Sequence, residues 1–272
     1  MTKHYGNESV LYYKQTQHND LVVTIDGDKL TLWSPERVRQ SVFDLKNPTV
    51  PGLEYAKYML LALVFIPTPK SVVSIGLGGG SVPTALSILV KQCLIHVVEI
   101  DKDIVFIAKN YFGFRENPLM KLYVDDGYSF IESCPVSHDI ALLDAYKGSA
   151  QPKNLSSKIF FQNLAKTLKP EGVCVVNLIT SDTENLNNAV NNMKAVFKNM
   201  WYVECKTSRN VVYFASNYDY DEFILAANIK KIQELLPSGN PDLLKNAKKL
   251  HTSDGLSIVK KLYQLAFKKS SQ

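Results

Sequence analysis

The chain has 272 residues, of which 46% are hydrophobic and 21% charged, and its formal net charge is +5. This composition is ordinary for a globular protein that buries a sizeable core, and the length suits a core domain with smaller additions. The longest apolar run, Met59 to Ile66, is far shorter than the ~20 residues that cross a bilayer, and the polar N-terminus lacks a signal-peptide region. We therefore expect a cytoplasmic protein with no membrane segment.

Cysteine usage agrees with an intracellular protein. The four cysteines, Cys93, Cys134, Cys174 and Cys205, are widely spaced and form no Cys-x-x-Cys pair. Three of them fall in or beside apolar, strand-like runs, where a thiol behaves as a small hydrophobic group. Neither a metal site nor a disulfide is expected.

Short apolar runs separated by turn signals predict a small β-rich unit at residues 1–52. Leu21–Ile25 and Lys29–Trp33 are strand-like, and Asp26-Gly27 between them is a hairpin signal. The apolar stretch Leu53–Ile66 then predicts a single buried helix leading into the core.

From residue 72 onward, strand-like and helical runs alternate, which predicts a parallel sheet covered on both faces. Lys169–Gly172 predicts a sharp stop before the fifth strand. The expected strands are Val72–Ile75, Ile95–Ile100, Leu122–Val124, Ile140–Asp144 and Val173–Leu178, and the helices between them are Val82–Val90, Asp103–Tyr111, Tyr128–Ser133 and Ser156–Leu168.

The core is expected to end in an antiparallel pair after a helix at about Thr183–Lys198. Only Thr207–Asn210 separates the strands Trp201–Lys206 and Val211–Ser216, which suits a hairpin rather than a helical crossover. This order is that of Rossmann-like methyltransferases. The predicted fold is therefore a doubly wound, mostly parallel α/β sheet over residues 53–217.

Residues 218–272 read as a helical C-terminal extension that includes Leu256–Phe267. Between Asn228 and Gln272 nine lysines stand against three acids, a net charge of +6, so the preceding residues sum to about −1. An amphipathic helix with a solvated basic face explains these lysines most simply. A nucleic-acid or acidic partner for this tail stays open.

A glycine run follows the first core strand, and an acidic residue follows the second. Gly76, Gly78, Gly79 and Gly80 allow a sharp turn and close approach of a ligand to the backbone. Glu99 lies close to the spacing at which a carboxylate meets a ribose hydroxyl beside such a turn. An adenosine-like ligand is predicted.

Further acids follow the other strands, at the sheet edge where ligands bind. They are Asp101 after the second strand, Asp125-Asp126-Gly127 after the third and Asp144 at the end of the fourth. Each has a structural alternative, because Asp101 could cap the next helix and Asp126-Gly127 could form only a turn. Together they favour a nucleoside site.

The combined motifs resemble the spermidine synthase (polyamine aminopropyltransferase) family over about Leu21 to Ser216. The motifs are Gly76-Leu-Gly-Gly-Gly-Ser81, Val98-Glu-Ile-Asp101, Asp125-Asp-Gly127, Leu143-Asp144 and Leu168-Lys-Pro-Glu-Gly172, with Arg39-Gln-Ser41 and Leu53-Glu-Tyr55 upstream.

The resemblance implies a site for S-adenosylmethionine or its decarboxylated form as co-substrate. Glu99 would hold the ribose and Asp126 would face the adenine amine, while the segment from Gly76 to Gly80 would border the methionine portion. The neighbouring Ile100, Asp125 and Gly127 join this site. Gln40 and Tyr55 would enter it from the N-terminal side.

Two positions depart from the family pattern. The family carries an Asp in the glycine loop, where this chain has Gly79, and an acid three residues after the strand-end Asp144, where it has Lys147. Both acids suit a diamine and an aminopropyl ammonium group. Their replacement suits intact S-adenosylmethionine better, because glycine-loop amides at a helix N-terminus accept its carboxylate.

The implied reaction is displacement at a carbon bonded to a sulfonium, which needs alignment more than catalytic side chains. Asp144 and Tyr146 are the candidate catalytic residues. Aminopropyl transfer to a small molecule such as a polyamine, methyl transfer to an unknown acceptor, and a non-catalytic nucleoside-binding module all remain open. So does a homodimer.

Overall fold

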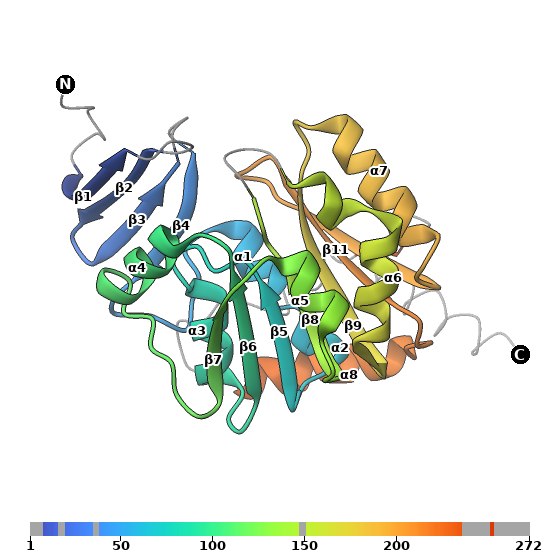
Figure 1. The fold of residues 1–272 in the computed structure, drawn as a ribbon. Helices are drawn as coiled ribbons and strands as arrows, with labels where there is room; N and C mark the ends of the chain where they lie inside the picture. Colours follow the sequence, from blue (N-terminus) through green and yellow to red (C-terminus); the bar gives the residue numbers. More distant parts are fainter. Residues whose placement is uncertain (1–7, 16–19, 35–37, 147–150, 236–250, 253–272) are drawn as a thin grey trace, which may run out of the picture.

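The computed structural model describes residues 8–15, 20–34, 38–146, 151–235 and 251–252. They form two β-sheets (Figure 1). The smaller, N-terminal sheet is antiparallel with the order β1-β2-β3-β4, and the predicted hairpin connects its second and third strands through Gly27, whose φ is +57°. Strand β1 was not predicted. The bounds are β1 Ser9–Gln15, β2 Asp20–Asp26, β3 Lys29–Trp33 and β4 Arg39–Asp44.

The predicted helix Leu53–Ile66 is wrong as a single element. The structure divides it into α1, Glu54–Met59, and α2, Ala62–Phe65. Around Leu60 the backbone bonds span three residues rather than four, as in Leu61 N–H to Tyr58 O at 2.9 Å. Such tightening ends one helix and starts another. The short helices position Tyr55 at the end of the core sheet.

The core sheet confirms the predicted doubly wound, mostly parallel fold. Its order is β12-β10-β11-β9-β8-β5-β6-β7, with strands β5 to β9 parallel and β10, β11 and β12 antiparallel. The bounds are β5 Ser71–Ile75, β6 Leu94–Glu99, β7 Met120–Val124, β8 His138–Leu143, β9 Leu168–Ile179, β10 Asn199–Glu204, β11 Asn210–Ser216 and β12 His251–Thr252.

Helices cover both faces of the core sheet (Figure 1). One buried apolar cluster joins α1, α2, α3, α4 and α8 to the sheet, and a second joins α5, α6 and α7 to its other face. The remaining bounds are α3 Ser81–Leu89, α4 Lys102–Asn110, α5 Gly127–Ser133, the 3-10 helix η1 Lys153–Ser156, α6 Lys158–Lys166, α7 Thr183–Lys194 and α8 Glu222–Leu235.

Most boundaries of the core elements lie within two residues of the prediction, but the start of β9 and the end of α7 differ by more. Lys169–Gly172 is not a stop before the strand but an irregular part of β9, because Leu168 already pairs with His138 and regular pairing resumes at Val173. Helix α7 ends four residues earlier than predicted. The expected helix Leu256–Phe267 lies outside the described residues. Within the described part, no helix is long and apolar enough to span a membrane.

Aromatic contacts fix the N-terminal sheet against the core. The ring of Tyr12 in β1 lies 5.2 Å from that of Tyr111 and 5.8 Å from that of Phe106 in α4. Phe43 in β4 meets Phe112 edge-on at 6.4 Å. Strand β4 is thereby held beside the ends of the core strands.

A buried imidazole pair at the opposite end of the core sheet predicts acid sensitivity. Nδ1 of His96 lies 3.1 Å from Nε2 of His138, which is fully buried, and burial lowers the pKa of His138 to about 4. Between pH 6.5 and 4 the unfolded chain binds a proton that the folded protein excludes. The free energy of unfolding should therefore fall as the pH falls through this window, by up to about 3 kcal/mol.

Urea denaturation at pH 7, 5.5 and 4.5 measures this loss. A His138→Phe variant should flatten the pH dependence. If the free energy of unfolding depends on pH equally in the variant and the wild type, His138 is not the group responsible.

Candidate functional site

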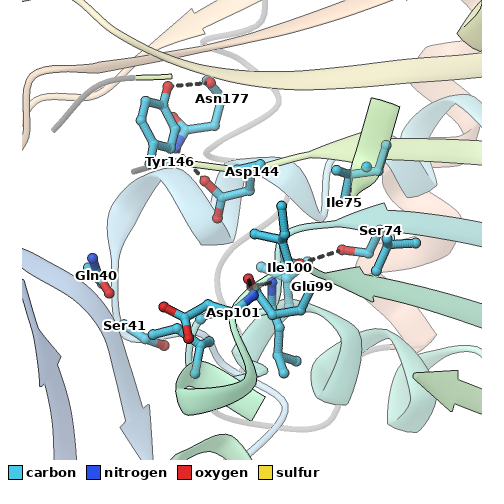
Figure 2. Close-up of a pocket in the computed structure, with 18 of the residues that line it drawn as sticks. Gln40, Ser41, Ser74, Ile75, Glu99, Ile100, Asp101, Asp144, Tyr146 and Asn177 are labelled. Atoms are coloured by element: carbon cyan, nitrogen blue, oxygen red, sulfur yellow. Dashed lines mark hydrogen bonds between the residues drawn. The ribbon is translucent and has the colours of Figure 1, made fainter. Parts of the chain in front are cut away.

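A cavity of about 420 Å³ lies at the carboxyl ends of the core strands, bordered on its other side by β4 (Figure 2). Its polar and charged lining comes from both sheets and from α1. Of the residues predicted from the sequence, the following line it: Gln40, Tyr55, Gly76, Gly78, Glu99, Ile100, Asp125, Asp126, Gly127, Asp144 and Tyr146.

The first two loop glycines have the backbone conformations that require glycine. Gly76 has φ of +97°, and a Cβ there would lie 2.1 Å from the carbonyl oxygen of Asp144. Gly78 has φ of +53°. The absence of side chains lets β5 approach the segment after β8 and opens the loop toward the cavity.

Glu99 holds the glycine loop from the end of β6. One carboxylate oxygen accepts from Leu77 N at 3.0 Å and the other from Asp101 N at 2.9 Å. Burial raises the pKa of Glu99, against the effect of these amides. The carboxylate is therefore fixed at the cavity wall, with lone pairs left for a ligand's hydroxyl groups.

Gly79 and Gly80 are not among the residues that line the cavity, and their place beside a ligand stays a prediction. A Cβ on Gly79 would lie 2.7 Å from both the Ser41 hydroxyl and the Phe112 ring, and one on Gly80 would lie 2.9 Å from the Phe114 ring. Both glycines serve close packing of the loop against buried aromatic rings.

The other rim acids have structural bonds as well as cavity positions. Asp101 caps α4 by accepting from Asp103 N at 2.8 Å, and Asp126 caps α5 by accepting from Ser129 N at 2.9 Å. Asp125 accepts from Asp126 N at 2.8 Å. Asp101 and Asp126 therefore cap helices, as the structural alternative predicted, and both also line the cavity. Ile100 is 66% exposed and offers an apolar surface beside them.

Asp144 and Tyr146 follow β8, where the Asp144 backbone meets Gly76. Burial raises the pKa of Asp144, while bonds from Asn177 and Tyr55 oppose that rise. Gln40 O, 3.1 Å from the Tyr55 hydroxyl, is an alternative acceptor for the single hydrogen of that hydroxyl. The Tyr146 hydroxyl donates to Asn177 O at 2.6 Å, and burial raises the pKa of that phenol far above its usual value. Lys147 lies outside the described residues.

The sequence reasoning missed several lining residues, among them the polar or charged Arg39, Ser41, Asn177 and Asn210. Arg39 and Ser41 flank Gln40 within a motif that the resemblance already included, which was a usable signal. The two asparagines lie in strand-like runs and follow no motif. Within the described ranges, no cluster of three His, Cys, Asp or Glu side chains could hold a metal ion.

A spermine/spermidine synthase domain model matches residues 55–216, more than half of the chain. The polyamine aminopropyltransferase of Vibrio vulnificus is 28% identical over 183 residues, covering 65% of this chain and 61% of that protein. The eEF1A lysine and N-terminal methyltransferase of Bos taurus is 28% identical over 162 residues, covering 56% of this chain and 23% of that protein. The chain thus spans less than two thirds of either relative.

Solved structures show the same fold. A probable spermidine synthase from Corynebacterium glutamicum superimposes with a TM-score of 0.70 at 20% identity, covering 84% of this chain and 87% of that one. Human methyltransferase-like protein 13 in complex with SAH superimposes with a TM-score of 0.63 at 23% identity, covering 70% and 96%. The fold is the Rossmann-like methyltransferase fold.

Proposed function

The chain belongs to the spermine/spermidine synthase domain family, and on that premise we propose that it is a transferase that binds intact S-adenosylmethionine and transfers its methyl group. The observation that carries the donor assignment is the Glu99 carboxylate, fixed by two amides beside the glycine loop and facing the cavity. Such a carboxylate can accept from both ribose hydroxyls. Asp126 and Ile100 are then placed to contact the adenine.

Arg39 favours the intact donor over the decarboxylated one. Among the described lining residues it is the single cation, and it stands next to Gln40 and Ser41 on β4. Its guanidinium carbon lies 6.0 Å from the Trp33 ring centroid. A guanidinium matches the donor's carboxylate, which the decarboxylated form lacks. The packing around Gly79 leaves no room for the family's loop Asp.

The chemistry is a displacement in which the methyl carbon leaves sulfur and bonds to a nucleophile of the acceptor. The electron pair of the broken bond stays on sulfur, which neutralises the sulfonium. The cavity's task is to align the two reactants and exclude water. Asp144, which follows β8 and contacts Gly76 through its backbone, would orient a cationic or hydroxyl acceptor and receive its proton.

Aminopropyl transfer from the decarboxylated donor is the second candidate. Five carboxylates line the cavity against one guanidinium: Glu99, Asp101, Asp125, Asp126 and Asp144. This excess of negative charge attracts a polyamine and suits a donor that ends in an ammonium group.

Calorimetric titration of S-adenosylmethionine, decarboxylated S-adenosylmethionine and methylthioadenosine distinguishes the candidates. The proposal expects the intact donor to bind most tightly. Tighter binding of the decarboxylated donor, with turnover on putrescine, would replace methyl transfer by aminopropyl transfer. Binding of none of the three would leave a scaffold without nucleoside function.

Replacing Arg39 with methionine should weaken S-adenosylmethionine binding by about five- to tenfold, because a partly exposed charge-assisted bond is lost. Binding of methylthioadenosine, which has no carboxylate, should stay within twofold. Arg39→Lys keeps the charge and should recover part of the affinity. Lys91→Met is the control, because Lys91 is exposed and precedes β6, at the end of the strands away from the cavity. Equal losses for both ligands would contradict a carboxylate contact.

A further inference from the structure

Two asparagines from different strands form a chain of bonds that ends on Asp144. Asn210 Nδ2 donates to Asn177 Oδ1 at 3.0 Å, and Asn177 Nδ2 donates to Asp144 Oδ1 at 2.8 Å. Figure 2 shows Asp144 and Tyr146 both reaching Asn177. Asn177 is 2% exposed, so its amide depends on these protein partners.

The hairpin β10–β11 brings this chain together. Strand β11 runs antiparallel to β9, so its first residue, Asn210, lies at the edge where β9 ends. Asn210 pairs with Ile179 and Asn177 pairs with Val212. The two asparagines are therefore diagonal neighbours on one face of the sheet.

We propose that Asn177 and Asn210 are paired positioning residues, in which Asn210 fixes the orientation of the Asn177 amide so that it always presents a donor to Asp144. An amide has one carbonyl and one NH₂ end. Because the NH₂ of Asn210 occupies the carbonyl of Asn177, only the NH₂ end of Asn177 can face Asp144. That donor stabilises the ionised carboxylate, which accepts hydrogen bonds, and not the protonated acid.

Few other groups around Asp144 can stabilise its ionised carboxylate. Tyr55 from α1 also bonds to it but shares its hydroxyl with Gln40 O, and Tyr146 directs its hydroxyl to Asn177 O. Burial of Asp144 opposes its ionisation. Its role toward an acceptor rests on the proposed function, but its ionisation can be measured without any substrate.

The test is the pKa of Asp144, measured in the full chain by NMR of ¹³C-labelled aspartate carboxyls and assigned with Asp144→Asn. Losing a bond to a charged group corresponds to about one to two pKa units. We expect Asn177→Leu to raise the pKa of Asp144 by that amount. Asn210 bonds to Asn177 rather than to Asp144. Asn210→Leu should nevertheless raise the pKa of Asp144 by about one pKa unit.

The double variant provides the decisive comparison. If Asn210 acts through Asn177, Asn177→Leu combined with Asn210→Leu should match Asn177→Leu alone. Asn210→Ser removes the same donor without added apolar bulk and covers failure of the leucine variant to fold. Asn199→Leu, in the same hairpin but bonded to Tyr218 and Asp219, is the matched control.

An unchanged pKa in the Asn210 variants, or additive rises in the double variant, would overturn the proposal. Failure of S-adenosylmethionine to bind would overturn the proposed function and leave this measurement unaffected. The two ideas can therefore fail separately.

Discussion

Replacing Glu99 with alanine should weaken S-adenosylmethionine binding at least about 100-fold. The substitution removes the hydrogen bonds between the carboxylate and the ribose. A hydrogen bond to a charged group contributes about 1.5–3 kcal/mol to the free energy of binding. The change also leaves the amides of Leu77 and Asp101 without their acceptor, so the glycine loop itself loses its fixed shape. Isothermal titration calorimetry measures the affinity, and thermal unfolding measures the accompanying loss of stability.

Asp125, a second acid at the rim of the cavity, is the control that shows whether the effect is specific to Glu99. Asp125 also accepts a backbone amide, but from its chain neighbour Asp126 and not from Leu77 of the glycine loop. Asp125→Asn should change the affinity less than about threefold. Glu99→Gln keeps the size of the side chain and should lie between alanine and the wild type. An Asp125→Asn loss as large as that of Glu99→Ala would contradict the special place given to Glu99.

Restoring the family's loop acid with Gly79→Asp should destabilise the protein rather than create a site for a decarboxylated donor. The Cβ alone would lie 2.7 Å from Ser41 Oγ and from the Phe112 ring, and Phe112 is 1% exposed. Overpacking and a carboxylate forced among apolar groups together cost at least about 3 kcal/mol. For a chain of this size, that lowers the melting temperature by roughly 10 °C.

Gly113 offers a matched control. It is exposed, has φ of +70°, and a Cβ there would meet no atom within 4 Å. Aspartate tolerates this backbone conformation, so Gly113→Asp should cost less than about 1 kcal/mol. If Gly79→Asp is as stable as the wild type and binds decarboxylated S-adenosylmethionine more tightly, the packing argument is wrong.

The nucleoside side of the cavity was largely predictable from the sequence. Its residues lie between positions 76 and 127, and each follows a strand that the alternation of apolar and polar residues reveals. Parallel strands place such residues at one edge of the sheet. The pattern did not distinguish the glycines that face the cavity from Gly79 and Gly80, because contacts with Phe112 and Phe114 depend on tertiary packing.

The opposite side could not be predicted in the same way. Asn177 and Asn210 come from β9 and β11, and their contact depends on the register between those strands. A single asparagine in an apolar run carries no signal of its own. The break between α1 and α2 was missed for a similar reason, because an apolar stretch that is buried all round has no face to mark where a helix ends.

The division of the cavity between these two sides has an evolutionary consequence. One continuous stretch of chain supplies most of the nucleoside wall, whereas the facing wall is gathered from β8, β9 and the exposed-turn hairpin β10–β11. Mutations in the hairpin can remodel the second wall and leave the first unaltered.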